Sequence, residues 1–346
     1  MSGFLDQARK LLDAGVVEDA RKDFERVFDA IRSLRDVFYK SSLDLNNIES
    51  VFSAFKMAHR IGKLGDYPEP DIAELDKSTE VLIVRTLDES LRYSYTRTDN
   101  ITHPPAGYDR LVSLVEAVNQ RVGGESTCSL LTFNYDIALD YALVHAGISH
   151  DYCLAPSTDR SVLKLLKLHG SLNWAMCPTC HRIKPVPVSM DTVLELANNS
   201  PISSFTLPAA AIIGESKCEE CSSPLTAEPV IVPPIWNKIT GPDQLAHVWK
   251  QAAVELGQAE NIVCIGYSLP ESDSFFKYLF ALGTVGPGNL RRLWVFDKDC
   301  GNGVEQRYRK LIGKGIEGGF KFVGGDEGKF SNAVWKQNEL WRTLTT

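Results

Sequence analysis

The sequence predicts an α/β protein in which a parallel sheet carries helices on both faces. Three observations predict this fold. Residues 1–124 repeat apolar residues at helical spacing. After Gly124, short and wholly apolar runs alternate with helical stretches, which is typical of strands buried on both faces. Two C-x-x-C pairs interrupt that alternation. We therefore expect a helical region at 1–124, a Rossmann-like domain at 125–174 and 226–346, and a zinc-ribbon insertion at 175–225.

The helical region is predicted from apolar residues that recur every three or four positions. A loop is expected at Leu64–Pro70 because it contains Gly65, Pro68 and Pro70. Further helices are expected from Asp76 to about Tyr95 and from Tyr108 to Arg121. Asn46 or Asn47 is a suitable N-cap for the third repeat. The repeats are Leu5, Ala8, Leu11 and Leu12; Phe24, Val27, Phe28, Ile31 and Leu34; and Ile48, Val51, Phe52 and Phe55.

The second part of the chain alternates candidate strands with candidate helices. In parallel sheets of this kind, ligands bind at the carboxyl ends of the strands, so the polar residues that follow each strand are site candidates. The expected strands are Ser129–Phe133, Leu163–Leu168, Val230–Val232, Ile262–Ile265, Leu293–Phe296 and Phe320–Val323. The expected helices are Ile137–His145, Gln244–Gly257, Asp273–Leu282 and Val304–Ile312.

Composition narrows the classes of function. The 346 residues are 44% hydrophobic and 23% charged, which is ordinary for a globular protein. A net charge of -7 argues against sequence-independent binding of nucleic acid, which requires a basic surface. We find no apolar run of about 18 residues, and the charged N-terminus does not resemble a signal peptide. A cytoplasmic protein is therefore expected, whose cysteines are thiols or metal ligands.

The two C-x-x-C pairs predict a structural metal site. Cys177 with Cys180, and Cys218 with Cys221, each place two thiols on one tight turn, and two such turns form a tetrahedral zinc site. Four sulfur ligands leave no open position, so the zinc would not be catalytic. The alternatives are a redox pair, unrelated surface cysteines, or His181 as a substitute ligand. The remaining cysteines are expected to be buried small apolar residues: Cys128, Cys153, Cys264 and Cys300.

Polar residues follow four of the predicted strands. Histidine changes charge near neutral pH, and a Gly-x-Ser turn allows a phosphate or ribose to approach the backbone. Purely structural roles remain open: Asn134 as a helix cap, Gly266 and Ser268 as a turn, and Asp297 as a turn cap. Trp174 and Trp236 are expected to be packing residues. The four motifs are T-F-N-Y-D at 132–136, L-H-G-S at 168–171, G-Y-S-L-P at 266–270 and D-K-D at 297–299.

In this order, together with the paired cysteines, these motifs resemble the sirtuin family, and in detail its bacterial sirtuin-like branch. The resemblance covers residues 125–300 and extends weakly to the helix start at Asn47–Glu49. It implies NAD as the bound substrate. Asn134 and Asp136 would hold nicotinamide and its ribose, and His169 would orient or deprotonate a ribose hydroxyl. Gly266 and Ser268 would meet phosphates or ribose, and Asp297 the adenosine end.

Two features depart from the family pattern. Sirtuins open with a strand and a glycine-rich loop that binds the pyrophosphate. Before residue 100 this sequence has only Gly3, Gly15, Gly62 and Gly65, none in a G-x-G arrangement after an apolar strand. We therefore expect this loop to be missing, through a misassigned start or broken gene, through cutting of the chain, or through true loss. Its loss would weaken nucleotide binding and leave neighbouring strands unpaired.

The second departure concerns the reaction. Phe133 stands where deacylases carry glutamine, and Val232–Trp236 replaces the strand that grips acyl-lysine. Cleavage of nicotinamide from NAD is therefore favoured, and the resemblance extends this to a role in bacterial defence. The alternatives are a noncatalytic module that binds NAD, ADP-ribose or a partner, and an NAD-dependent protein deacylase. A homo-oligomer is compatible with the sequence.

Overall fold

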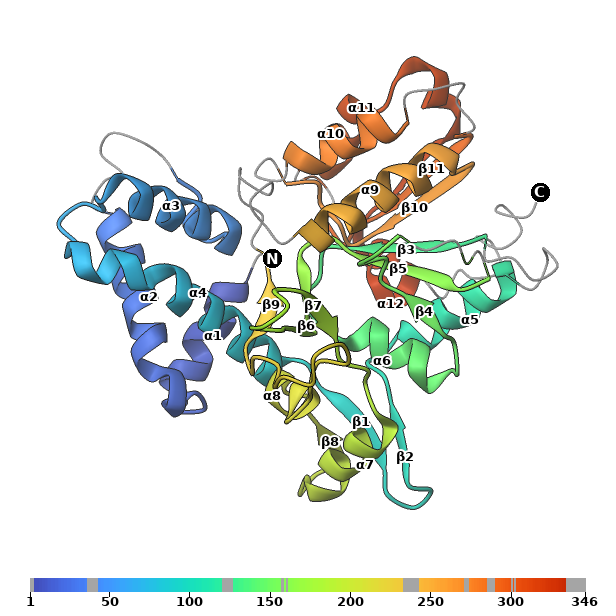
Figure 1. Cartoon of the computed structure of the whole chain (residues 1–346). Helices are drawn as coiled ribbons and strands as arrows, with labels where there is room; N and C mark the ends of the chain where they lie inside the picture. Colours follow the sequence, from blue (N-terminus) through green and yellow to red (C-terminus); the bar gives the residue numbers. More distant parts are fainter. Residues whose placement is uncertain are drawn as a thin grey trace. The chain divides into compact units, whose positions relative to one another are not determined.

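The computed structural model describes residues 3–35, 43–119, 127–156, 159, 161–232, 243–270, 274–284, 290–299, 301 and 303–333 (Figure 1). The chain forms two compact units. Unit 1 comprises Met1–Thr102, Tyr135–Ile137 and His169–Thr240, and unit 2 comprises His103–Asn134, Ala138–Leu168 and Gly241–Thr346. Among the described residues, no helix is long and apolar enough to cross a membrane.

Unit 1 begins with four helices. α4 (Glu69–Ser90) packs against α1 (Phe4–Asp13), α2 (Arg21–Arg35) and α3 (Ile48–Ile61). The repeated apolar residues of the first three helices are buried, as their spacing predicts. The Asn47 side chain caps α3 by accepting a hydrogen bond from the Glu49 N–H at 2.9 Å, which confirms the predicted helix start.

The segment after α3 differs from the prediction in two ways. α4 begins at Glu69 rather than Asp76, because Pro70 lies in its first turn, where the missing proline N–H leaves no partner unsatisfied. The residues that follow α4 form strands: β1 (Tyr93–Thr96) and β2 (Ile101–His103), joined by a turn in which Asn100 is left-handed. β8 (Ser204–Phe205) pairs antiparallel with β1.

A second antiparallel sheet of unit 1 has β6 (Gly170–Met176) at its centre, between β7 (Ile183–Pro185) and β9 (Pro229–Ile231). The expectation that the segment at 230–232 joins the parallel sheet is therefore wrong. A three-residue apolar run carries no information about strand direction. α7 (Met190–Asn199) and α8 (Ala209–Ile213) lie between the cysteine pairs, and α8 packs against β6.

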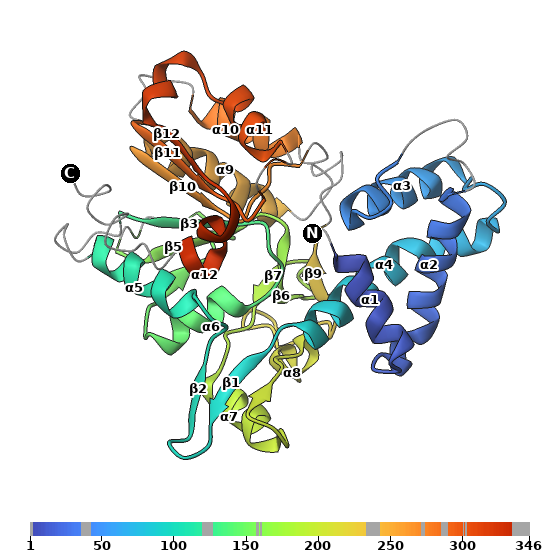
Figure 2. The ribbon, with the colours of Figure 1, turned by 180° about the vertical axis from the view of Figure 1, so that it is seen from behind.

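Unit 2 contains the parallel strands that the sequence predicts, in two three-stranded sheets (Figure 2). One has the order β3 (Ser129–Thr132), β5 (Leu163–Lys167), β4 (His150–Asp151). The other has the order β10 (Asn261–Ile265), β11 (Arg292–Phe296), β12 (Phe320–Val323). Every strand pair in both sheets is parallel.

Helices cover both faces of the β3–β5–β4 sheet. On one face, Val112 and Val115 of α5 (Tyr108–Asn119) share a core with Leu163 and Leu165 of β5. Lys164, which lies between these two leucines, points the other way, and its Nζ pairs with Glu255 Oε1 of α9 (Asp243–Gln258) at 2.7 Å.

α5 also contacts the second sheet, because Leu114 packs against Phe296 of β11. The described part of unit 2 also contains the α-helices α6 (Ala138–His145), α10 (Ser274–Gly283), α11 (Val304–Leu311) and α12 (Phe330–Ala333).

β3 and β10 differ from their neighbours in exposure. Every residue of both strands is half-buried, whereas β5 and β11 are mostly buried. Among the described strands, β3 pairs only with β5 and β10 only with β11. Both strands are therefore edges of their sheets within the described part of the chain. Their apolar sequences are those of strands in a sheet that is covered on both faces.

Candidate functional site

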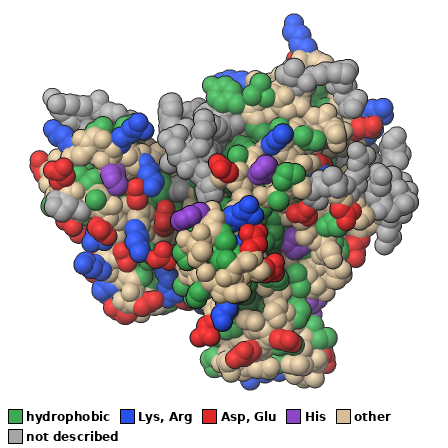
Figure 3. All heavy atoms as spheres, in the orientation of Figure 1, with side chains coloured by type: hydrophobic (Ala, Val, Ile, Leu, Met, Phe, Trp, Pro, Cys, Tyr) green, Lys and Arg blue, Asp and Glu red, His purple; other side chains and the backbone are tan. Residues whose placement is uncertain are grey.

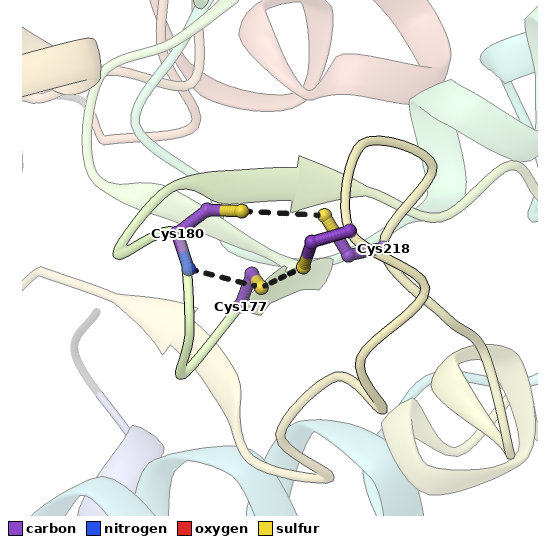
Figure 4. Close-up of side chains that lie close together, drawn as sticks. Cys177, Cys180 and Cys218 are labelled. Atoms are coloured by element: carbon purple, nitrogen blue, oxygen red, sulfur yellow. Dashed lines mark hydrogen bonds between the residues drawn. The ribbon is translucent and has the colours of Figure 1, made fainter.

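The four paired cysteines of unit 1 converge. The Sγ atoms of Cys177, Cys180, Cys218 and Cys221 all lie within 4.8 Å of one another (Figure 4). Cys177 Sγ lies 3.5 Å from Cys221 Sγ, and Cys180 Sγ lies 4.0 Å from Cys218 Sγ. Four sulfurs bound tetrahedrally at ~2.3 Å from zinc would be about 3.8 Å apart. The thiols therefore have the spacing of a metal site.

The two turns that carry these cysteines have the same backbone geometry. In the first, Cys177 O accepts from His181 N–H at 2.9 Å, and Cys177 N–H donates to Arg182 O at 2.9 Å. In the second, Cys218 makes the equivalent bonds with Ser222 and Ser223, each at 2.8 Å. His181 and Ser222 are both left-handed, with φ of 53° and 58°. His181 is thus an exposed turn residue and does not belong to the group of ligand atoms.

Local hydrogen bonds favour the thiolate form of Cys221, which is the form that binds a cation. Bonds from the Ser223 side chain and backbone lower the pKa of Cys221 to about 6, which favours a thiolate at neutral pH. The hydrogen bond with Cys221 raises the pKa of Cys180 to about 12. A divalent cation would favour the thiolate form of all four side chains.

The described cysteines outside this cluster have raised pKa values, in contrast to Cys221. Burial raises the pKa of Cys128 to about 11, of Cys153 to about 12 and of Cys264 to about 11. They are poor nucleophiles at neutral pH. Cys153 is buried, as predicted, whereas Cys128 and Cys264 are half-buried. Cys300 lies outside the described residues.

In unit 2, Asn134 follows β3 with an exposed side chain. Its backbone N–H donates to Thr132 Oγ1 at 3.1 Å, which bends the chain directly after the strand. α6 begins only at Ala138, so Asn134 lies outside the N-cap position that was its structural alternative. The amide therefore stays accessible at the carboxyl end of β3.

An aromatic stack joins the Asn134 segment to the G-Y-S-L-P loop. The rings of Phe133 and Tyr267 lie parallel within 12°, with centroids 4.5 Å apart. Phe276 of α10 packs edge-on against both rings. Because Asn134 follows Phe133 and Ser268 follows Tyr267, the stack holds these two predicted site residues in neighbouring loops of unit 2.

The G-Y-S-L-P loop is itself held by α11. Arg307 Nε donates to Ser268 O at 3.0 Å, and the buried Tyr308 hydroxyl donates to Tyr267 O at 2.8 Å. Burial raises the pKa of Tyr308 well above its ordinary value, so the phenol remains a donor. Gly266 and Leu269 are left-handed, with φ of 69° and 49°. Neither Arg307 nor Tyr308 belongs to a motif, and sequence reasoning missed both.

Asp297 lies beside Gly266 at the same edge. Phe296 O accepts from the Gly266 N–H at 2.8 Å, and Asp297 follows Phe296. The Asp297 carboxylate is buried, and its Oδ1 accepts from Asp299 N–H at 2.9 Å. The turn-capping alternative for Asp297 is therefore present in the structure. Asn134, Gly266, Ser268 and Asp297 thus gather at the carboxyl ends of β3, β10 and β11.

His169 and Asp136 belong to unit 1. The His169 side chain is buried, and its carbonyl oxygen accepts from Val232 N–H at 2.7 Å. Gly170 is left-handed at φ 88°, and a Cβ there would lie 2.2 Å from Val230 O. Only glycine can therefore follow His169. Asp136 is half-buried directly after Tyr135.

The two tryptophans expected to pack have different outcomes. Trp174 is fully buried on β6, as predicted. Trp236 and the rest of residues 233–236 lie outside the described residues.

On the face of the molecule drawn in Figure 3, acidic and basic side chains are interspersed, and no continuous basic surface is seen.

Comparisons with known proteins find similar structures but no similar sequences. No protein-family model matches the chain, and no curated protein matches it. One similar structure comes from work on sirtuin substrate affinity, with 13% identity, coverage of 69% of each chain and a TM-score of 0.34. Another is a Sir2 structure in complex with EX-527, 2′-O-acetyl-ADP-ribose and a deacetylated p53 peptide. It has 13% identity, covers 78% of this chain and 83% of that one, and has a TM-score of 0.35.

Proposed function

We propose that this chain is a sirtuin-like protein that binds NAD and cleaves nicotinamide from it. The observation that carries the proposal is the gathering of Asn134, Gly266, Ser268 and Asp297 at one carboxyl edge of the parallel strands of unit 2. That edge is where open α/β sheets bind nucleotides. The order of the motifs resembles that of sirtuins, and this resemblance implies the dinucleotide NAD.

Each of these side chains has a chemical role in the proposal. The exposed Asn134 amide donates and accepts, which suits the carboxamide of nicotinamide or a ribose hydroxyl. Gly266 is exposed and a Cβ there would meet no atom within 4 Å, so a phosphate or ribose can approach the backbone. Ser268 adds a hydroxyl to the same loop, and Asp297 would accept from adenosine.

The proposed reaction breaks the bond between C1′ of the ribose and the nicotinamide nitrogen. Nicotinamide leaves with the bonding electron pair, water adds to C1′, and a proton is released with ADP-ribose. The transition state is oxocarbenium-like, so catalysis requires oriented polar groups and little bulk water. His169 would orient or deprotonate a ribose hydroxyl, and Asp136 would bind that ribose; both roles follow from the family resemblance.

Two alternative functions also involve binding of NAD at this edge. A noncatalytic module would bind NAD or ADP-ribose without turnover. An NAD-dependent deacylase would need a groove for acyl-lysine. Phe133 argues against deacylation, because its ring is stacked on Tyr267 where a glutamine would present an amide.

For the cysteine centre we propose a structural zinc ion held by Cys177, Cys180, Cys218 and Cys221. The sulfur spacing and the two matched turns support four-thiolate binding. All four ligands come from the protein, so the ion would stabilise the ribbon and take no part in the cleavage of NAD.

Release of nicotinamide from NAD by the purified chain tests the proposed activity. We expect release by the wild type and by His247→Ala, a control at an exposed histidine of α9, and a loss of about 100-fold or more in His169→Ala. Undiminished release in His169→Ala would remove this histidine from the mechanism. Calorimetric binding of NAD without release would favour the noncatalytic module. Turnover of acyl-lysine peptides would favour the deacylase.

A further inference from the structure

We propose that Tyr135 is a positioning residue that holds His169 in one orientation. The inference rests on the proposed function in one respect, which is that His169 acts on NAD. Both residues lie in unit 1, and sequence reasoning assigned Tyr135 no role.

Tyr135 is linked to His169 in two ways, through its ring and through its hydroxyl group. The two rings lie against each other with centroids 5.9 Å apart and planes tilted by 36°. The Tyr135 hydroxyl donates to Val232 O at 3.3 Å, and the N–H of the same Val232 donates to His169 O at 2.7 Å. Tyr135 therefore contacts the histidine ring directly and the histidine backbone through one residue.

Tyr135 is itself fixed by the strand that follows His169. Its carbonyl oxygen accepts from Leu172 N–H of β6 at 2.9 Å, and Ser171 Oγ lies 3.4 Å from the same oxygen. Ser171 Oγ in turn donates to Asn173 Oδ1 at 2.6 Å, and Asn173 Nδ2 donates to Val186 O at 3.0 Å. Because this chain of bonds is buried, Tyr135 cannot shift without breaking hydrogen bonds in β6.

The residue type matters at position 135. An aliphatic side chain would pack in the interior but could neither offer an aromatic face to the imidazole nor donate to Val232 O. The ring contact restricts the rotation of the His169 ring, and the bond to Val232 O holds the tyrosine ring in place against it. A misplacement of about 1 Å can cost a reaction about 100-fold, so a residue that fixes the histidine is worth that much to the rate.

The test compares Tyr135→Phe and Tyr135→Leu with a matched control. Tyr135→Phe keeps the ring and removes only the hydroxyl. The control is Tyr95→Phe, which removes another buried tyrosine hydroxyl of unit 1, one that bonds to Asn100 and Asn198. The first measurement is the NMR signal of the His169 ring through a pH titration, assigned with His169→Gln. The second is the kcat and KM of nicotinamide release.

We expect Tyr135→Phe and Tyr135→Leu to move or broaden the His169 signal and to displace its titration curve, while Tyr95→Phe leaves both unchanged. We also expect kcat to fall about 10-fold in Tyr135→Phe and about 100-fold in Tyr135→Leu, with KM within about 3-fold of the wild type. Thermal melting checks that each variant is folded.

An unchanged His169 signal and titration in a folded Tyr135→Phe would overturn the proposal. So would an equal change in Tyr95→Phe, because the effect would then be a general one of unit 1. If neither the wild type nor any variant releases nicotinamide, the proposed NAD cleavage is wrong. The NMR comparison then still decides whether Tyr135 positions His169.

Discussion

Asp88 of α4 has an unusual pKa for an aspartate. Its carboxylate is almost fully buried and accepts a hydrogen bond from Ala209 N–H at 3.0 Å, while Arg85 Nη1 lies 3.8 Å from Oδ2. Burial outweighs these two favourable contacts and raises the pKa from 3.8 to about 6. Above pH 6 the folded protein holds this carboxylate charged at a cost in stability.

The sign of the pH dependence follows from that shift. The folded pKa lies above the unfolded value, so the folded state binds the proton more tightly, and stability falls as pH rises from about 4 to about 6. A shift of about 2 units corresponds to at most about 3 kcal/mol. We expect Asp88→Asn to raise the free energy of unfolding by about 1–2 kcal/mol at pH 8, because asparagine still accepts from Ala209.

Urea denaturation at pH 8 and pH 5 measures this difference. The gain should shrink at pH 5, and Asp13→Asn, at an exposed aspartate of α1, should show no comparable change. A destabilised Asp88→Asn at pH 8 would mean that the Arg85 pair contributes more than the burial costs.

Residue identity at the candidate site could be predicted wherever a short motif carries it. Asn134, His169, Gly266 and Ser268 stand in such motifs, each after a predicted strand, and their roles stay predictions. Their supports could not be predicted. Tyr308 contacts a loop about 40 positions earlier, and nothing in its own helix sequence indicates that contact.

Lys167 illustrates the same limit in the core. It lies in an apolar run, and its buried Nζ pairs with Asp140 Oδ2 at 2.7 Å. The pairing depends on which helix covers β5, and local sequence does not determine that.

At the scale of elements, the two turns that carry the paired cysteines have matching backbone geometry. They share their hydrogen bonds and the left-handed residue after the second cysteine of each pair. Such turns converge only when the intervening 37 residues, 181–217, fold back between them, and α7 and α8 lie in that segment. We therefore expect the metal to stabilise the ribbon as a unit.

Metal analysis of the purified chain should find about one zinc per chain. Cys218→Ser should lose the zinc and expose residues 177–226 to protease, because removal of one ligand leaves three thiolates without closed coordination. Cys128→Ser changes a cysteine outside the cluster and should keep both zinc and protease resistance. Substantially less than one zinc in the wild type would refute the four-thiolate site.

The bounds of elements were predictable where apolar periodicity is strong. The predicted starts of α5 and α11 are those of the structure, and the predicted start of α6 lies one residue from it. β6 was missed because it begins inside the L-H-G-S motif, at Gly170, only two residues after the predicted strand Leu163–Leu168 ends. The antiparallel direction of β9 could not be predicted, since it depends on its partner β6.

At the scale of the whole molecule, the candidate residues fall into two groups. Asn134, Gly266, Ser268 and Asp297 belong to unit 2, while His169, Asp136 and the four cysteines belong to unit 1. The chain passes from unit 2 to unit 1 between Asn134 and Tyr135, and again between Leu168 and His169. Both crossings fall inside predicted site motifs. The sequence-based division into 1–124, 125–174 with 226–346, and 175–225 stays a prediction.

Hydrogen exchange with and without NAD is the most direct test of the nucleotide site. We expect NAD to slow exchange together in three segments, 129–134, 261–268 and 292–299, because their carboxyl ends meet at one edge of unit 2. Exchange in α1–α3 should stay unchanged. If saturating NAD slows exchange in none of the three segments, or slows it only elsewhere, this edge is not the nucleotide site.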